Sequence, residues 1–212
     1  IEAARIPGIR IVRGVGIASY NRVRSVLLLS RVPFSEIRSV ALDTSSRSSA
    51  AIVRLLLADL YGANPEYHRA VPELPRMLAT ADAALLIGDP ALTANLEGLH
   101  VLDLAEGWNR LTGLPLVMAI WAVRRDVAPE PFLWSRDYAR HRSGEIIDAA
   151  GVRTGLDRKL LADYFEMNLH YDLDDDDERG LAEFYRRAAV HGLISSPDLP
   201  PFSGVPLVPR SF

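Results

Sequence analysis

Short apolar runs alternate with helical patterns along the first 123 residues. The runs are mostly continuous and do not alternate between apolar and polar positions, as expected for strands that are covered on both faces. They lie at 9–12, 15–18, 23–30, 40–42, 83–87, 101–104 and 116–123. Between them, the stretches 47–61, 72–80 and 106–112 have helical spacing, and Gly62 provides a stop for the first. This alternation predicts a parallel, doubly wound α/β sheet.

The pattern changes after Val123. Pro129 and Pro131 break the chain, and the following residues up to about 194 have helical periodicity. We expect helices near 143–150, 157–169 and 177–191, with an extended, proline-rich tail over 195–212. The chain therefore combines an α/β part with a largely helical part.

Composition limits the classes of function. The chain has 212 residues, a net charge of −3 and no cysteine, which excludes disulfides, thiolate catalysis and cysteine-ligated metals. Acidic and basic residues are interspersed, so we expect neither nucleic acid nor a membrane surface as a partner. No apolar run is long enough to span a bilayer. No leader peptide is visible either, so a cytoplasmic location is expected.

The stretch from Asp43 to Ala50 reads Asp-Thr-Ser-Ser-Arg-Ser-Ser-Ala and joins a predicted strand to a predicted helix. The free N–H groups of a helix start and the helix dipole favour an anion. Further donors come from the hydroxyls of Thr44, Ser45, Ser48 and Ser49. The same residues also suit an ordinary cap, with Ser45 or Ser46 bonded to the first turn. The pattern thus indicates either an anion-binding helix start or a plain N-cap.

A metal site is not expected. The acidic run at 172–177 has contiguous aspartates and no glycine among them, unlike a calcium loop, and it precedes a predicted helix. Negative charge there favours helix capping. The five histidines lie far apart, with no pair at helical spacing.

Four segments are distinctive in their order and spacing. They are Arg22–Pro33 (RVRSVLLLSRVP), Val40–Ser49 (VALDTSSRSS), Ala81–Leu92 (ADAALLIGDPAL) and Asp103–Pro115 (DLAEGWNRLTGLP), which runs on into Ala119–Ala122 (AIWA). Together they resemble the chorismate dehydratase family of the futalosine route to menaquinone. The resemblance covers about residues 1–194.

The resemblance implies an α/β, two-lobed type II periplasmic-binding-protein-like fold, with a ligand cleft between the lobes. Residues 25–121 would form the second lobe, and residues 1–24 and 122–212 would form part of the first. Family members carry a further strand and an Asn-containing loop ahead of the position of Ile1. We therefore expect an N-terminal portion of the first lobe to lie outside this sequence.

The implied reaction is loss of water from chorismate to give 3-[(1-carboxyvinyl)oxy]benzoate, with no cofactor. Chorismate, the expected small-molecule partner, is a dianion, so the cleft must supply donors for two carboxylates. The matching segments contain hydroxyls and amides but no histidine. A substrate carboxylate acting as its own base would explain this, unless the base lies in the N-terminal portion. The sequence leaves open whether the protein is a monomer or a homodimer.

The resemblance also selects site residues. Ser25 would be catalytic, at the hinge facing the cleft, although a strand hydroxyl bonded to a neighbouring backbone is the alternative. Arg47 would hold a carboxylate or else pair with Asp43. Substrate contacts are further expected from the helix-start hydroxyls and from Gly88, Asp89 and Trp121. For Asp89 a loop-fixing role is favoured, and for the tryptophans core packing is the default.

Two other functions remain open. A 1,4-dihydroxy-6-naphthoate synthase of the same pathway would share the fold, but that family has a His-Glu pair where this chain has Gly88 and Asp89. The second is a non-catalytic small-anion-binding protein of the same fold.

Overall fold

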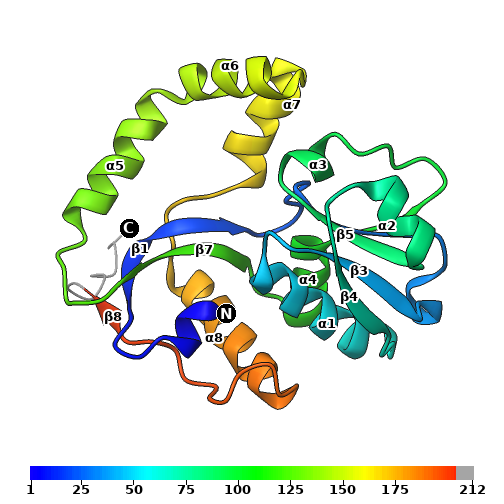
Figure 1. The fold of residues 1–212 in the computed structure, drawn as a ribbon. Helices are drawn as coiled ribbons and strands as arrows, with labels where there is room; N and C mark the ends of the chain where they lie inside the picture. The colour runs from blue at the N-terminus through cyan, green and yellow to red at the C-terminus, as the bar shows by residue number, and fades with distance from the viewer. Residues whose placement is uncertain (204–212) are drawn as a thin grey trace.

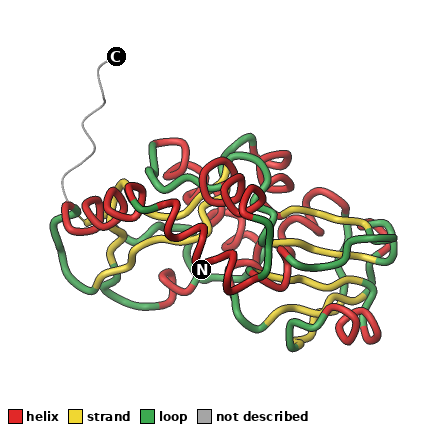
Figure 2. Tube along the Cα trace, turned by 90° about the horizontal axis from the view of Figure 1, so that it is seen from above, coloured by secondary structure: helices red, strands yellow, loops and turns green. Residues whose placement is uncertain are grey.

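The computed structural model describes residues 1–203, and these residues form two separate β-sheets with eight α-helices among them. The two sheets lie side by side along the long direction of the molecule (Figures 1 and 2). Helices α1 to α4 belong with the five-stranded sheet, and α5 to α7 arch over the three-stranded one (Figure 1). The lobe boundaries at 24/25 and 121/122 stay predictions, and the second of them falls inside a strand, β7 (Leu116–Val123).

The larger sheet has the strand order β4-β3-β5-β2-β6. Its members are β2 (Val26–Ser30), β3 (Ser39–Asp43), β4 (Glu66–Ala70), β5 (Ala83–Ile87) and β6 (His100–Asp103). The sequence did not predict β4, because Glu-Tyr-His-Arg-Ala is too polar for a buried strand. The strand lies at the sheet edge, where polar side chains face water.

The predicted parallel arrangement holds for four of the five strands, and β2 is the exception. Strand β3 is parallel to β4 and β5, but β2 is antiparallel to both β5 and β6. All five residues of β2 are buried, so its continuous apolar pattern matches that of a parallel strand. Apolar periodicity reports burial on both faces and carries no information on strand direction.

Helix α1 (Arg47–Tyr61) begins and ends where the sequence predicts. Ser46 is its N-cap, and Gly62 closes it in a left-handed conformation with φ 63°. Its buried face, which includes Leu55, Leu56 and Leu57, packs into the main core. The remaining helices around this sheet are α2 (Leu74–Thr80), α3 (Asp89–Leu92) and α4 (Leu104–Thr112).

The smaller sheet has the order β7-β1-β8, with β1 at Arg10–Ser19 and β8 at Phe202–Ser203. The predicted strands at 9–12 and 15–18 are thus one strand, which pairs with β7 through two register shifts. Among the described residues β7 is an edge strand, and its residues Ala119, Trp121 and Ala122 are exposed.

The helical part contains α5 (Glu130–His141), α6 (Ser143–Thr154), α7 (Arg158–Ala162) and α8 (Asp175–Val190). A π-helical turn, η3 (Asp163–Asn168), follows α7 directly, so the single helix expected over 157–169 is divided. The acidic run caps α8: Asp174 and Asp177 form a reciprocal capping box. The capping interpretation of that run is confirmed. Half of the expected extended tail, residues 204–212, lies outside the described residues.

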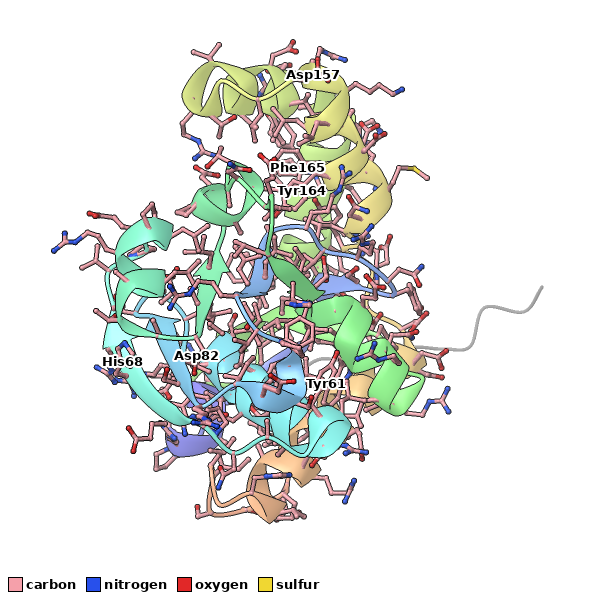
Figure 3. All side chains as sticks on the ribbon, turned by 90° about the vertical axis from the view of Figure 1, so that its right-hand side faces the viewer. Tyr61, His68, Asp82, Asp157, Tyr164 and Phe165 are labelled. Atoms are coloured by element: carbon pink, nitrogen blue, oxygen red, sulfur yellow. The ribbon has the colours of Figure 1, made fainter. Side chains whose placement is uncertain are left out.

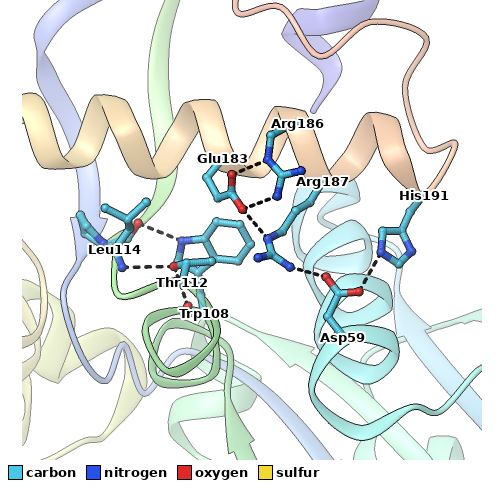
Figure 4. A network of polar contacts seen from close by, with 9 residues as sticks. Asp59, Trp108, Thr112, Leu114, Glu183, Arg186, Arg187 and His191 are labelled. Carbon is cyan, nitrogen blue, oxygen red and sulfur yellow. Dashed lines mark hydrogen bonds and ion pairs between the residues drawn. The ribbon is translucent and has the colours of Figure 1, made fainter.

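Helix α8 ties the helical part to α1. Arg187 reaches Asp59 of α1 at 2.5 Å, and His191 lies 2.9 Å from the same carboxylate. Beside this network (Figure 4), Trp108 of α4 is fully buried and donates its indole N–H to the carbonyl of Pro115 at 3.1 Å. The core-packing interpretation of Trp108 is therefore confirmed.

Candidate functional site

Chemically active residues gather at one edge of the five-stranded sheet. Strands β3, β5 and β6 all end there, at Asp43, Ile87 and Asp103, and the antiparallel β2 begins there just after Ser25. In open α/β sheets, ligands bind outside the carboxyl ends of the strands. This edge is consequently the first place to look for a site.

Ser25 is held at this edge from two sides. Its carbonyl accepts a hydrogen bond from the Gly88 amide at 2.7 Å. Its Oγ accepts one from the Tyr164 hydroxyl at 3.0 Å. Tyr164 comes from the π-helical turn η3, above the sheet edge in Figure 3. Because the serine hydroxyl is the acceptor in that bond, its own proton remains available to a ligand.

The start of α1 contains the N-cap residue of the helix and also lines a cavity. Ser46 Oγ accepts from the Ser49 amide at 3.2 Å, which is the ordinary capping bond. Ser48 and Ser49 line a cavity of about 300 Å³ with Val26, and Ser48 Oγ lies 3.0 Å from the Ile1 nitrogen. The Ser49 amide and hydroxyl are therefore both bonded to Ser46, at 3.2 and 3.0 Å, although Ser48 and Ser49 line the cavity.

Tyr185 is a further lining residue of the same cavity. The residue is 1% exposed, and its hydroxyl has no hydrogen-bond partner within the part of the chain that the structure describes. Burial raises the pKa of the Tyr185 hydroxyl, so it stays a neutral donor at physiological pH. A buried hydroxyl without a hydrogen-bond partner lowers the stability of the protein unless a ligand or a water molecule supplies the partner.

The other residues of the helix-start motif point elsewhere. Thr44 and Ser45 are exposed, and the Ser45 amide donates to Asp43 Oδ1 at 2.8 Å. Arg47 pairs with Glu2 at 2.7 Å, and not with Asp43. Asp43 is 3% exposed, and its second oxygen lacks a partner among the described residues.

The turn after β5 is fixed by its backbone and by a distant arginine. Gly88 has φ 69°, a conformation that favours glycine, and it begins the short helix α3. The Asp89 carboxylate pairs with Arg153 at the end of α6. This ion pair, like the Tyr164–Ser25 bond, links the helical part to the larger sheet.

Trp121 lines a different cavity. With Phe132 and Phe165 it lines a cavity of about 820 Å³ between the β1–β7 pair and helices α5 and α6. His170 borders this cavity too, and its Nε2 is 2.8 Å from the buried carboxylate of Asp177. Six of the nine sequence-selected residues thus form three groups: Ser25 with Gly88 and Asp89, Ser48 with Ser49, and Trp121 alone.

Three residues near the edge were not selected from the sequence: Tyr164, Tyr185 and Asp103. The tyrosines sit in helical apolar patterns where a core role is the default, and only the fold brings them to the site. Asp103 carries a local signal, since an aspartate between a strand and a helix is a typical N-cap. Its side chain does cap α4, accepting from the Ala105 and Glu106 amides.

Neither a metal cluster nor a membrane span is found in the described part of the chain. No group of three or more His, Asp or Glu side chains in residues 1–203 is placed to hold a metal ion. No helix in the same range is long and apolar enough to cross a bilayer.

The fold defines a class of protein. The chain superposes on the periplasmic aliphatic sulphonate binding protein SsuA from Escherichia coli with a TM-score of 0.61 at 14% identity, covering 98% of this chain and 75% of that one. It superposes on protein AF1704 from Archaeoglobus fulgidus with a TM-score of 0.66 at 24% identity, covering 89% and 75%. The protein therefore has a periplasmic-binding-protein-like α/β fold, as predicted.

The sequence narrows this class to one family. Residues 1–190 match the family described as menaquinone biosynthesis, and the chain belongs to it. The chain is also 33% identical over 190 residues to the chorismate dehydratase of Thermus thermophilus. That match covers 79% of this chain and 69% of the relative. The family resemblance drawn from the four segments is confirmed.

Proposed function

We propose that the protein converts chorismate to 3-[(1-carboxyvinyl)oxy]benzoate and water, as a carbon–oxygen lyase without a cofactor. The observation that carries this proposal is the 33% identity to a chorismate dehydratase over 190 residues. The sheet edge supports it with hydroxyl and amide donors of the kind that a small dianion requires. The substrate would lie outside the ends of β3, β5 and β6.

One carboxylate of the substrate would bind at the start of α1. Ser48 and Ser49 line the 300 Å³ cavity there, and the helix dipole favours negative charge. Tyr185 lines the same cavity, and its unpaired hydroxyl would donate to this carboxylate. Trp121 belongs to the larger cavity, so we assign it no contact with this carboxylate.

The reaction removes a ring proton next to the carbon that bears the hydroxyl, and the hydroxyl leaves with a second proton as water. We assign the donor to the leaving oxygen to Ser25, whose Oγ is polarised by the hydrogen bond from Tyr164. A substrate carboxylate would take the ring proton and pass it to Ser25 Oγ after the water has left, which restores the serine hydroxyl. The buried carboxylate of Asp103 is ill suited to this, because backbone N–H groups already occupy it.

Incubation of the purified protein with chorismate tests the function. The expected result is stoichiometric formation of the aromatic enol ether, followed by liquid chromatography with mass detection and by the loss of the diene absorbance. Binding without turnover, seen as a thermal shift with unchanged chorismate, would instead indicate an anion-binding protein. No binding and no turnover would reject both functions.

Tyr185→Phe should raise KM for chorismate and leave kcat nearly unchanged. A hydrogen bond from a neutral donor to a charged group contributes about 1.5–3 kcal/mol, equivalent to roughly 10- to 150-fold in KM. The unliganded variant should be as stable as the wild type or more so, because it no longer buries an unpaired hydroxyl. Steady-state kinetics and thermal denaturation check both parts.

Tyr171→Phe is the matched control for this change. The Tyr171 hydroxyl donates to the Phe165 carbonyl at 3.1 Å, so its removal should lower stability without changing KM. If Tyr185→Phe lost stability and kept its KM, the hydroxyl would have a structural partner and no role in binding.

A further inference from the structure

Arg24, the residue before Ser25, has an unusual backbone conformation. Its φ is 64°, and it is the one non-glycine residue of residues 1–203 with a positive φ. In this left-handed region the Cβ atom crowds the neighbouring carbonyl, so an arginine stays there only when its surroundings impose it. Strained residues of this kind concentrate at functional sites.

The Asp103 carboxylate imposes that conformation. Its Oδ2 accepts from the Arg24 amide at 2.7 Å. Its Oδ1 accepts from the Val23 amide at 3.1 Å, and also from the Ala105 and Glu106 amides of α4 at 3.0 and 3.4 Å. One side chain, 3% exposed, therefore fastens the segment before β2 to the first turn of α4.

The backbone conformation of Arg24 affects the orientation of Ser25, the next residue in the chain. The peptide plane between Arg24 and Ser25 sets the direction in which the serine side chain leaves the chain. In the observed state the Ser25 carbonyl meets the Gly88 amide and its Oγ meets the Tyr164 hydroxyl. If φ of Arg24 relaxed to a negative value, this plane would turn and both contacts would move.

We propose that Asp103 is a positioning residue of the reaction: it holds Arg24 in the left-handed conformation and so presents the Ser25 hydroxyl to the substrate. This inference rests on the proposed function, because it assigns Asp103 to the same reaction. Asp103 does not itself touch the substrate. Its role is to keep one hydroxyl in place.

Asp103→Asn separates this role from helix capping. Asparagine caps helices as well as aspartate does, and its single carbonyl oxygen can keep the three bonds made by Oδ1. Its amide nitrogen would then face the Arg24 N–H, donor against donor, so the bond to Arg24 is lost. We expect kcat to fall about 100-fold, the cost of a misplaced reacting group, with KM nearly unchanged.

A second substitution tests positioning directly. Glycine adopts positive φ freely, so Arg24→Gly should restore much of the kcat lost in Asp103→Asn when the two are combined. Alone, Arg24→Gly should keep the wild-type kcat. If the double variant were no more active than Asp103→Asn, Asp103 would act by some means other than the conformation of Arg24, and the proposal would be overturned.

Asp82→Asn is the matched control. Asp82 is also a carboxylate that accepts backbone bonds, from the Arg38 and Ser39 amides at 2.9 and 3.0 Å, but it lies just before β5, at the opposite end of that strand from Gly88. Figure 3 shows it apart from Tyr164. This variant should keep the wild-type kcat. If Asp82→Asn lowered kcat as much as Asp103→Asn, general destabilisation would account for both losses.

Hydrogen–deuterium exchange separates this inference from the proposed function. The wild type is first assayed with chorismate, and no turnover there would reject the function alone. In either case, exchange at the amides of residues 22–25 should be faster in Asp103→Asn than in the wild type or Asp82→Asn. Unchanged exchange would show that Asp103 does not hold this segment and would overturn the positioning claim.

Discussion

Replacing Ser25 with alanine is expected to lower kcat for chorismate by about 10²–10³-fold, the typical loss when one donor to developing charge is removed. The hydroxyl receives a hydrogen bond from Tyr164, so its own proton can go to the departing oxygen. KM should change little, because Ser25 is assigned no carboxylate contact. The free energy of unfolding should fall by only about 0.5–1.5 kcal/mol, because the hydrogen bond to Tyr164 is the one interaction lost.

Ser30→Ala provides a control on the same strand. Ser30 is fully buried at the other end of β2 and donates to the Val32 carbonyl at 2.7 Å. Its loss should reduce stability and leave kcat as in the wild type. Should Ser25→Ala behave in the same way, with full kcat and a lower melting temperature, Ser25 would be a structural hydroxyl and the catalytic assignment would be wrong.

Trp108→Ala should lower the free energy of unfolding by about 3–5 kcal/mol, a larger loss of stability than we expect for Ser25→Ala or Ser30→Ala. The side chain is 0% exposed, packs edge-on against Phe184 of α8 at 6.3 Å, and bonds the Pro115 carbonyl (Figure 4). The substitution would leave a cavity and an unpaired carbonyl between α4, α8 and the start of β7. Denaturant unfolding measures the loss directly.

Trp134→Ala tests whether burial explains that loss. Trp134 is 68% exposed on α5 and stacks on Tyr138. Its removal should change the free energy of unfolding by less than about 0.5 kcal/mol, as for most surface positions. Similar losses from the two variants would contradict the packing account.

Elements with local signals could be predicted from the sequence. Helix α1 has a serine cap, an apolar face and a terminal glycine, and the structure reproduces all three. The acidic run before α8 acts through the same local physics, as negative charge at a helix start. These features depend on neighbours in the chain, which the sequence displays directly.

Strand direction and the π-helical turn could not be predicted in this way. Strand β2 is buried on both faces whichever way it runs, so only its partners reveal that it is antiparallel. The turn that carries Tyr164 continues the apolar pattern of α7 without a break in periodicity. In both cases long-range pairing decides the outcome.

Some residues of the candidate site could likewise be predicted from the sequence, and others could not. Ser25, the helix-start serines and the Gly88 turn could be selected because they belong to recognisable segments. Tyr185 could not be, because its unpaired hydroxyl becomes apparent only once α8 packs beside the cavity. Asp103 has a capping signal in the sequence, yet its bond to Arg24 spans 79 positions of chain.

Strand β7 presents an edge of the smaller sheet to which another strand can be added. All eight of its residues are apolar, and in the described structure its outer edge offers unpaired backbone groups beside exposed Ala119, Trp121 and Ala122. Natural edge strands usually carry a lysine, a proline or a bulge that discourages pairing with another chain. In β7 neither residue occurs, so within residues 1–203 this edge is suited to pair with a further strand.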